Sequence, residues 1–405
     1  MRPLALVLSL LAAAVLVPAG AAQETASGAP LVRLRDGHGS DLLFRVSPRT
    51  LRPVSRPIRT FRSSSGISVS PDGTRLASAD GSRRRGRIQF VDLAGWRSMG
   101  VARLGRVGWF TVGWVSRDRV VAIAGEASGR QRLLWVDATT RKIVARRSLG
   151  GWTANFLPVP GGLALVLGPR EDVGPLRIAI LDPRGGIRTI AVDRIRAGAA
   201  YADRGQVLTP AVTVDPESGR LYVVAARGLL AAEVELASGA VAYHSLGATA
   251  AKGNIEVWWR HAAWAGDGRI AVTGTHWPRP RRGRRPGGPV PFGLRMIDTR
   301  SWTMRTLDAR PDSMHVTGDA VLASGTRWFD GDRRAESTGL LGFDRAGRRA
   351  FTRFRGRQVA LLGSRGHRGY VWVRRTRTVH VLDLRHGRTL REIRSGRRAP
   401  FLLSP

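Results

Sequence analysis

The residues best suited to chemistry in this chain lie in one arginine-rich stretch, HWPRPRRGRRPGGP, which runs from His276 to Pro289. Its five arginines are Arg279, Arg281, Arg282, Arg284 and Arg285. A guanidinium fork matches the geometry of phosphate and carboxylate groups, and Trp277 adds a flat surface for stacking. Proline and glycine exclude regular structure here. This composition predicts either an anion-binding loop or a solvated low-complexity insert.

Two further segments are candidates for binding. The segment Val257–Trp264, VWWRHAAW, places Trp258 and His261 shortly before the arginine-rich stretch. Large aromatic side chains suit a ligand such as a sugar, and they equally suit packing between apolar surfaces. A shorter basic run supplies three more arginines. The predicted ligand-binding residues are therefore His276, Trp277, Arg279, Arg281, Arg282, Arg284, Arg285, Arg83, Arg84, Arg85, Trp258 and His261.

No catalytic motif accompanies these residues. The sequence contains no Gly-x-Ser-x-Gly elbow, no phosphate-binding loop ending in Gly-Lys-Ser or Gly-Lys-Thr, and no His-Glu-x-x-His. It has 0 Cys, which excludes disulfides, thiolate metal sites and a cysteine nucleophile. The 8 His are scattered along the chain. We expect no catalytic residue, no metal and no cofactor.

The first residues predict export. Arg2 precedes an apolar run, Leu4–Val17, and the small residues Ala19 to Ala22 form a cleavage site. We assign residues 1–22 to a signal peptide, with an uncleaved N-terminal anchor as the alternative. Residues 23–405 then form a single domain that is secreted or held in the cell envelope, without a transmembrane segment.

The formal net charge of +36 comes almost entirely from arginine, because only two of the 66 basic residues are lysine. One interpretation is a genome whose codons favour arginine, together with a solvated basic surface. The other is an anionic polymer, a lipid headgroup or a protein as partner, with nucleic acid bound only non-specifically. Charge bears on association and leaves the fold open.

A repeat shows how the chain positions these residues. An apolar residue followed by an acid recurs at the end of a strand-like run, with the acid at Asp92, Asp137, Asp182, Glu235, Asp298, Asp344 and Asp383, at intervals of 45, 45, 53, 63, 46 and 39. The segment Gly66–Gly100 reads as four short strands, the first two joined by the tight turn Ser70-Pro71-Asp72-Gly73. Four strands in a period of about 40–45 residues predict an all-β fold, a β-propeller.

The blades number seven or eight. Whole units begin near Gly66, Phe110, Trp152, Val207, Val257, Ser313 and Gln358. The remaining end pieces, Leu31–Arg59 and Ala399–Pro405, together make one more blade if the ring is closed by N- and C-terminal strands, which would remove its open edges. Seven blades, with the N-terminal piece added outside, is the alternative.

Two of the repeats resemble a known family. Val69-Ser70-Pro71-Asp72-Gly73-Thr74-Arg75-Leu76, and Val214-Asp215-Pro216 followed by Gly219-Arg220-Leu221-Tyr222, are similar to the YVTN-type repeats of secreted bacterial propellers. Those proteins are WD-like in form, although the Trp-Asp ending of WD repeats is absent here. The resemblance implies the fold, and it implies little about function because propellers host many activities.

Extra length in the repeat falls at 194–206, 247–256 and 275–292, which we expect to be insert loops on one face of the propeller. Long loops on a rigid scaffold are where binding usually occurs. The sequence therefore predicts an exported binding or interaction module with a basic, insert-bearing face. The alternative is an extracytoplasmic lyase or hydrolase at the channel mouth, using His261, Glu256 and His276, which must then lie within contact range. A third reading is a scaffold within an envelope complex.

Overall fold

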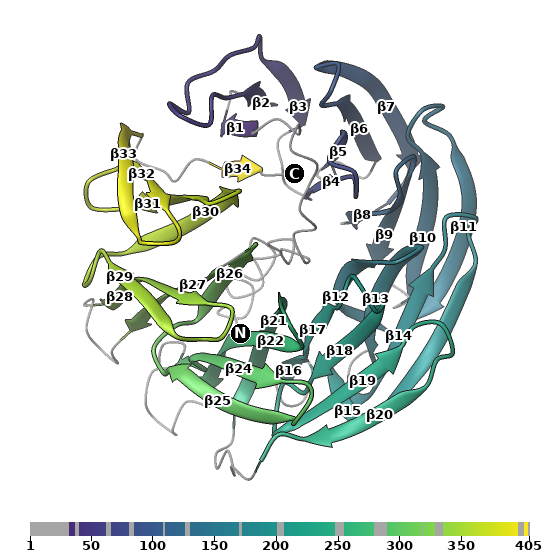
Figure 1. Ribbon diagram of the computed structural model, residues 1–405. Helices are drawn as coiled ribbons and strands as arrows, with labels where there is room; N and C mark the ends of the chain where they lie inside the picture. The colour runs from purple at the N-terminus through teal and green to yellow at the C-terminus, as the bar shows by residue number, and fades with distance from the viewer. Residues whose placement is uncertain are drawn as a thin grey trace, which may run out of the picture.

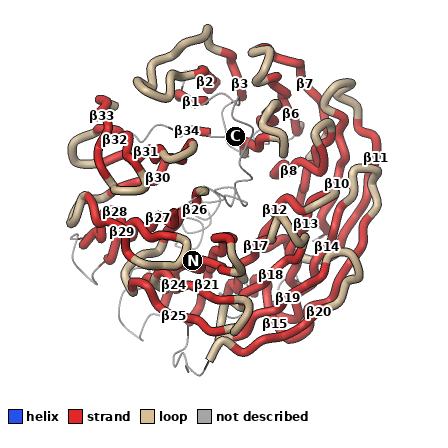
Figure 2. Tube along the Cα trace, in the orientation of Figure 1, coloured by secondary structure: helices blue, strands red, loops and turns tan. Residues whose placement is uncertain are grey.

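The computed structural model describes residues 32–36, 40–61, 66–80, 85–107, 110–125, 130–169, 172–200, 206–247, 255–278, 290–318, 320–328, 335–395 and 401–403. All regular structure within these ranges is β-strand, as Figure 2 shows. The described ranges hold no helix with the length and apolarity of a membrane span. The predicted signal peptide, residues 1–22, lies outside the described residues.

Six separate four-stranded sheets make up most of the molecule. The closing sheet contains β34 (Phe401–Leu403), β1 (Val32–Asp36), β2 (Ser40–Arg45) and β3 (Ile58–Phe61). The next two contain β4 (Ile67–Val69), β5 (Arg75–Asp80), β6 (Gly86–Asp92) and β7 (Arg97–Gly105), then β8 (Phe110–Ser116), β9 (Arg119–Gly125), β10 (Arg130–Asp137) and β11 (Ile143–Gly150). The other three contain β17 (Ala211–Val214), β18 (Arg220–Val224), β19 (Leu230–Glu235) and β20 (Val241–Ser245); β26 (Ser313–Thr317), β27 (Ala320–Trp328), β28 (Ala335–Asp344) and β29 (Arg349–Arg353); and β30 (Val359–Arg365), β31 (Arg368–Val373), β32 (Thr378–Asp383) and β33 (Arg388–Arg394).

A ten-stranded sheet completes the ring and contains two runs of four strands. The β12–β15 run is β12 (Trp152–Val159), β13 (Gly162–Gly168), β14 (Val173–Leu181) and β15 (Ile187–Ala200). The β21–β25 run is β21 (Ile255–Gly266), β22 (Arg269–Pro278), β24 (Leu294–Asp298) and β25 (Thr303–Asp308), with β23 (Val290–Pro291) paired to β22. The short strand β16 (Gln206–Thr209) joins the two runs.

The sheets stand around a common centre as the blades of a propeller (Figure 1). The first strand of each blade, such as β4, β8 or β12, lies near the centre, and the fourth strand lies at the rim. The all-β propeller of four-stranded blades predicted from the repeat is therefore present.

The first and last described strands of the chain meet in the closing sheet. β34 pairs antiparallel with β1, with Val32 opposite Leu403 and Leu34 opposite Phe401. The ring is thus closed by N- and C-terminal strands, as the end pieces predict. This pairing covers the inner edge of β1 and makes β34 the innermost strand of a four-stranded blade.

The predicted count of seven or eight separate blades and the predicted inserts need correction. β16 pairs antiparallel with β15 and parallel with β21, which merges two runs of strands into one sheet. Residues 194–200, expected in an insert loop, continue β15. The other expected inserts also contain strand at their described edges, in β21, β22 and β23. Extra length here extends the sheet, because added strands satisfy the backbone hydrogen bonds that a loop would leave to solvent.

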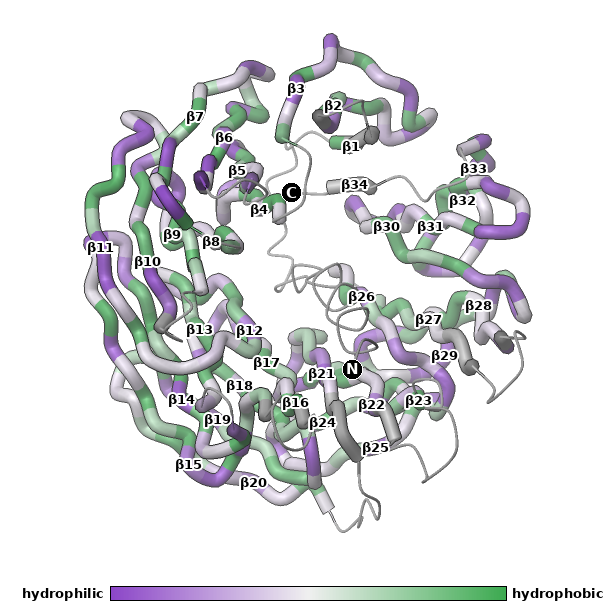
Figure 3. Tube along the Cα trace, turned by 180° about the vertical axis from the view of Figure 1, so that it is seen from behind, coloured by the Kyte–Doolittle hydropathy of each residue, from purple (hydrophilic) through white to green (hydrophobic). Residues whose placement is uncertain are grey.

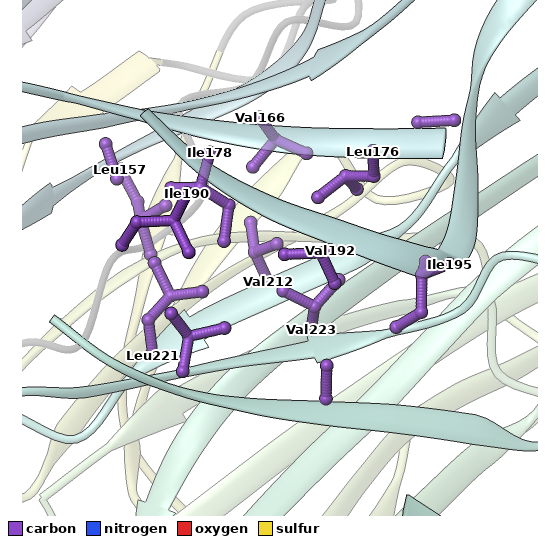
Figure 4. Close-up of a cluster of buried hydrophobic side chains, with 14 of the residues drawn as sticks. Leu157, Val166, Leu176, Ile178, Ile190, Val192, Ile195, Val212, Leu221 and Val223 are labelled. Carbon is purple, nitrogen blue, oxygen red and sulfur yellow. The ribbon is translucent and has the colours of Figure 1, made fainter. Parts of the chain in front are cut away.

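Apolar side chains fill the spaces between neighbouring sheets. Figure 4 shows one such interface, where Ile178 and Val166 of the β12–β15 run face Val212 and Val223 of the β17–β20 sheet. β13 is buried along its whole length, because both of its faces contact neighbouring sheets. Figure 3 shows hydrophilic residues along rim strands such as β7 and β11.

Arginines on the outer strands and turns bind backbone carbonyls of the neighbouring sheet. The guanidinium of Arg188, on β15, donates to the carbonyls of Leu236 and Ala237 in the turn after β19. The same arrangement recurs around the ring: Arg45 to Leu93 and Ala94, Arg119 to Pro183, Arg141 to Met99, Arg305 to Ala346, and Arg353 to Gly387. These interblade arginines connect sheets in a chain that contains no disulfide.

Candidate anion-binding face

The two ends of the blades differ in what they carry. Turns between first and second strands and between third and fourth strands lie at one end, which we call the turn face. Loops between second and third strands and the connections between blades lie at the other end, the insert face. Hydrogen bonds confirm this grouping in the β30–β33 sheet, where the Arg374 amide donates to Gln358 and the Ser395 amide donates to Arg377.

The repeated aspartates belong to the turn face and bind backbone amides. Asp137 accepts hydrogen bonds from the amides of Thr139 (3.0 Å) and Thr140 (2.7 Å). The hydrogen bond from the Gly95 amide holds the pKa of Asp92 below its usual range. These side chains therefore close turns, as their position before a turn predicts, and they offer no ring of carboxylates for a metal. The described residues include no group of His, Asp and Glu that could hold a metal ion.

Several arginines of the turn face form ion pairs with aspartates. Arg75 contacts Asp118, Arg97 contacts Asp92 at 3.3 Å, and Arg117 contacts Asp72 at 3.1 Å. Asp92 and Asp72, which also accept hydrogen bonds from turn amides, thus balance the charge of nearby guanidinium groups. Part of the positive charge at this end is therefore locally balanced.

Few of the predicted site residues can be placed with their side chains. His261, His276 and Arg85 are described fully; Trp258 and Trp277 lie in β21 and β22, but their side chains are outside the described part. Arg83, Arg84, Arg279, Arg281, Arg282, Arg284 and Arg285 lie outside the described residues. Arg85 is exposed at the loop between β5 and β6, on the insert face.

The two candidate histidines do not converge. His276 pairs with Trp258 across the antiparallel ladder of β22 and β21, and His261 pairs with Thr273. Because side chains alternate along a strand and the register is regular from Trp258 to His261, the two imidazoles project from opposite faces of the sheet. Burial lowers the pKa of His261 to about 4, so this imidazole is neutral at pH 7. This geometry does not assemble the acid–base pair that the enzyme alternative requires.

Two arginines that are not among the predicted site residues, Arg260 and Arg295, lie near His276. Arg260 is 3% exposed, and its Nη1 donates to the carbonyls of Ala225 and Gly228 in the loop between β18 and β19. The carbons Cζ of Arg260 and Arg295 lie 4.0 and 3.9 Å from the ring centroid of Phe292. Burial and the charge of Arg295 lower the pKa of Arg260 to about 9. We call the two arginines the Arg260–Arg295 pair.

A sequence signal for the pair exists. Arg295 lies between the buried residues Leu294 and Met296, and Arg260 precedes the buried run at Ala262 and Ala263. A charged residue inside an otherwise apolar strand is unusual unless it has a partner. Neither arginine belongs to one of the basic runs predicted as ligand-binding.

A second arginine cluster lies at the insert face of the β30–β33 sheet. It comprises six exposed residues, the arginine patch: Arg355, Arg357, Arg374, Arg375, Arg377 and Arg394. They lie together because Arg374 follows β31 beside Gln358, and because β32 begins at Thr378 opposite Arg394. Arg374 donates to the Gln358 side chain at 2.8 Å. No ion pair joins any of the six to another described residue.

Comparisons with known proteins support the fold. No protein-family model matches the chain, and no curated protein matches it in sequence. The structure is similar to dihydro-heme d1 dehydrogenase NirN in complex with DHE, with a TM-score of 0.59 and 15% identity over 95% of this chain and 76% of that chain. It is also similar to apo AztD from Citrobacter koseri, with a TM-score of 0.52 and 11% identity over 92% of this chain and 96% of that chain. At such low identity these similarities show the propeller fold alone.

Proposed function

We propose that the protein is an exported β-propeller that binds a polyanion through the arginine patch on its insert face. The partner presents repeated phosphate or carboxylate groups, as anionic wall polymers and lipid headgroups do. The observation that supports this proposal is the contrast between the two ends of the blades. Several arginines of the turn face pair with aspartates, whereas the six guanidinium groups of the patch form no ion pair with a described residue.

A rigid scaffold suits the arginine patch to this role. Arg394 lies on β33, and the other five arginines lie in the turn between β31 and β32 or in the connection from β29 to β30. Backbone hydrogen bonds, such as those from the amides of Arg374 to Gln358 and of Ser395 to Arg377, hold these segments together. Because the backbone at these positions is held by hydrogen bonds, bringing several guanidinium forks to one partner costs less conformational freedom than it would on an unattached loop. Multiple weak contacts of this kind give salt-dependent affinity.

We also count the ring as eight blades in this proposal. Each run within the ten-stranded sheet has the strand order of a separate blade, and β16 is an added link between them. Export rests on the apolar N-terminal run and its small-residue cleavage site. Sequencing the N-terminus of the mature protein tests export, because cleavage within residues 19–22 is expected.

Binding is tested with a charge-matched pair of triple variants. The patch variant Arg374→Ser, Arg375→Ser, Arg377→Ser is compared with a turn-face variant, Arg300→Ser, Arg345→Ser, Arg348→Ser, whose residues are also exposed. Binding to phosphatidylglycerol vesicles and to soluble polyphosphate is measured from 50 to 200 mM salt. Loss of three contacts should lower the slope of log affinity against log salt by roughly 2, in the patch variant alone. Equal losses in both variants would show that net charge, and not the patch, attracts the partner.

A further inference from the structure

We propose that the outer edge shared by the closing sheet and the β30–β33 sheet docks on an anionic lipid bilayer. Two exposed apolar residues, Val54 and Leu390, lie at the centre of this docking edge. The arginines that belong to it are Arg49, Arg52, Arg56 and Arg391. This inference goes beyond the proposed function, because the docking edge lies toward the turn face, away from the arginine patch, and makes an apolar contact that a soluble polyanion does not offer.

Val54 and Leu390 occupy the same position in two neighbouring blades. Each is the seventh residue after the one that opens the turn between third and fourth strands, Ser47 or Asp383. In both turns the amide four residues further on donates to the carbonyl of that opening residue at 2.8 Å. The fourth strand then bulges, at Leu390 in β33 and after Pro53 in the closing sheet. A bulge re-aims side chains away from the regular ladder, and these two are 65% and 54% exposed.

The connection from β2 to β3, which carries Val54, is long and is held from both sides. It spans residues 46–57, whereas corresponding connections such as 93–96 and 384–387 are far shorter. Leu51 is buried in one apolar cluster with side chains of β31 and β32, and the Tyr370 hydroxyl donates to the Pro48 carbonyl at 3.2 Å. On the other side, the Trp96 indole donates to the Arg56 carbonyl at 2.7 Å. Figure 1 shows the closing sheet between these two neighbouring sheets. The apolar tip is therefore presented by an anchored segment.

The positive charge of the docking edge is not balanced by acids on the same segments. Within the described part of the chain, none of its four guanidinium groups has a hydrogen bond or an ion pair. The connection from β2 to β3 contains no Asp or Glu. On β33, Arg391 is paired with Val381, which packs toward the closing sheet. Glu392 is paired with His380 and lies 3.3 Å from it, so this carboxylate projects from the opposite face.

An anionic bilayer is the partner that fits both kinds of side chain. Guanidinium groups bind headgroup phosphates, and clusters of about four to eight basic residues favour anionic lipid. Apolar side chains between them reach the boundary of the acyl chains, while the arginines stay at the level of the headgroups. A polyanion dissolved in water would engage the arginines but offers nothing apolar to Val54 and Leu390.

A single dye on the docking edge tests whether it enters a bilayer. Because the chain has 0 Cys, Val54→Cys and Leu390→Cys can each be labelled at one site with the polarity-sensitive fluorophore NBD. Val144→Cys is the matched control, because Val144 is the seventh residue after Asp137, is 47% exposed and lies in a bulge of the β8–β11 sheet. With phosphatidylglycerol vesicles, the emission of the first two labels should rise and shift to shorter wavelength. The control label should not change, and phosphatidylcholine vesicles should change none of the three.

The arginines are tested by co-sedimentation with the same vesicles. Arg52→Ser, Arg56→Ser is compared with Arg146→Ser, Arg147→Ser, a double variant of exposed residues on β11. Each arginine near an anionic surface contributes about fivefold in affinity, so the first variant should bind roughly tenfold to thirtyfold more weakly. The second variant should bind as the wild type does.

Four outcomes overturn the docking edge. The first is that the wild type does not bind phosphatidylglycerol vesicles. The second is bound vesicles with unchanged labels at positions 54 and 390, and the third is an equal shift of the control label. The fourth is the same shift with soluble polyphosphate, which would mean that an aqueous polyanion covers the edge. The patch variant should keep the dye shift on vesicles, so failure of the polyanion proposal, which is read with polyphosphate, leaves this test intact.

Discussion

Replacing Asp308 by Asn should weaken the contact between the β21–β25 run and the β26–β29 sheet. The Asp308 side chain is 6% exposed and contacts Arg310 at 2.8 Å and Arg349, on β29, at 2.6 Å. Hydrogen bonds from Arg310, and to a lesser extent from Arg349, lower the pKa of Asp308 from 3.8 to about 2. Burial of the carboxylate acts in the opposite direction but is outweighed. The structure thus places an ionised carboxylate across an interface between blades.

The size of the effect follows from that shift. A pKa difference of just under two units corresponds to about 2.4 kcal/mol at most. Both arginines are about half exposed, with side-chain exposures of 56% and 42%, and solvent screening reduces this to about 1–2 kcal/mol. Because the folded-state pKa is depressed, the stabilisation is complete above the unfolded pKa of about 3.9 and is lost as pH falls toward 2.

Thermal and urea unfolding at pH 7 and at stepwise lower pH measure this contribution. Asp267→Asn is the matched control, because Asp267 is 65% exposed and lies 3.9 Å from Arg269, where a surface pair contributes little. We expect Asp308→Asn to be less stable than the control at pH 7, with the difference shrinking between about pH 4 and pH 2. Equal stability of the two variants at pH 7, or a difference that does not change with pH, would refute the reasoning.

Three other outcomes are expected. Arg188→Met should lose about 1–2 kcal/mol in urea unfolding because it no longer binds the turn after β19, whereas Arg184→Met, an exposed neighbour, should not. Removing residues 399–405 leaves β1 without its inner partner, so protease cleavage within 32–61 should accelerate; unchanged cleavage would argue against closure as a stabilising contact. Burial lowers the pKa of His315 to about 4, so its contribution to stability is present above pH 6.5 and declines as pH falls toward 4, and His315→Gln should flatten the stability profile over that window.

The arginine excess has more than one structural use. Part of it binds carbonyls between blades, as Arg188 and Arg353 do, and part pairs with turn-face aspartates such as Asp118. Guanidinium groups suit the first use because one fork can reach two carbonyls, which an ammonium group does less well. Binding to an outside partner therefore concerns the remaining arginines, above all those of the patch.

The sequence by itself determined the repeat, the strands and the closure of the ring. These features rest on local chemistry: Ser70-Pro71-Asp72-Gly73 sets a turn, and an aspartate such as Asp137 closes the next one by binding amides two and three residues ahead. The incomplete units at the two ends predicted the pairing of β34 with β1. Turn chemistry and strand alternation involve residues only a few positions apart, so turns and strands can be predicted without a structure.

Only the tertiary structure decided which side chains meet. The register of β21 and β22, which is set by the turn between them, places His261 and His276 on opposite faces of the sheet, although the two residues lie on neighbouring strands. Arg260 and Arg295 both contact Phe292 because β22 lies between their strands. The strand β16 links two blades through backbone pairing, which no side-chain pattern in the sequence predicts. Contacts of this kind depend on how strands pair and sheets stack across long sequence separations. The periodicity of residues along the chain does not specify this pairing and stacking.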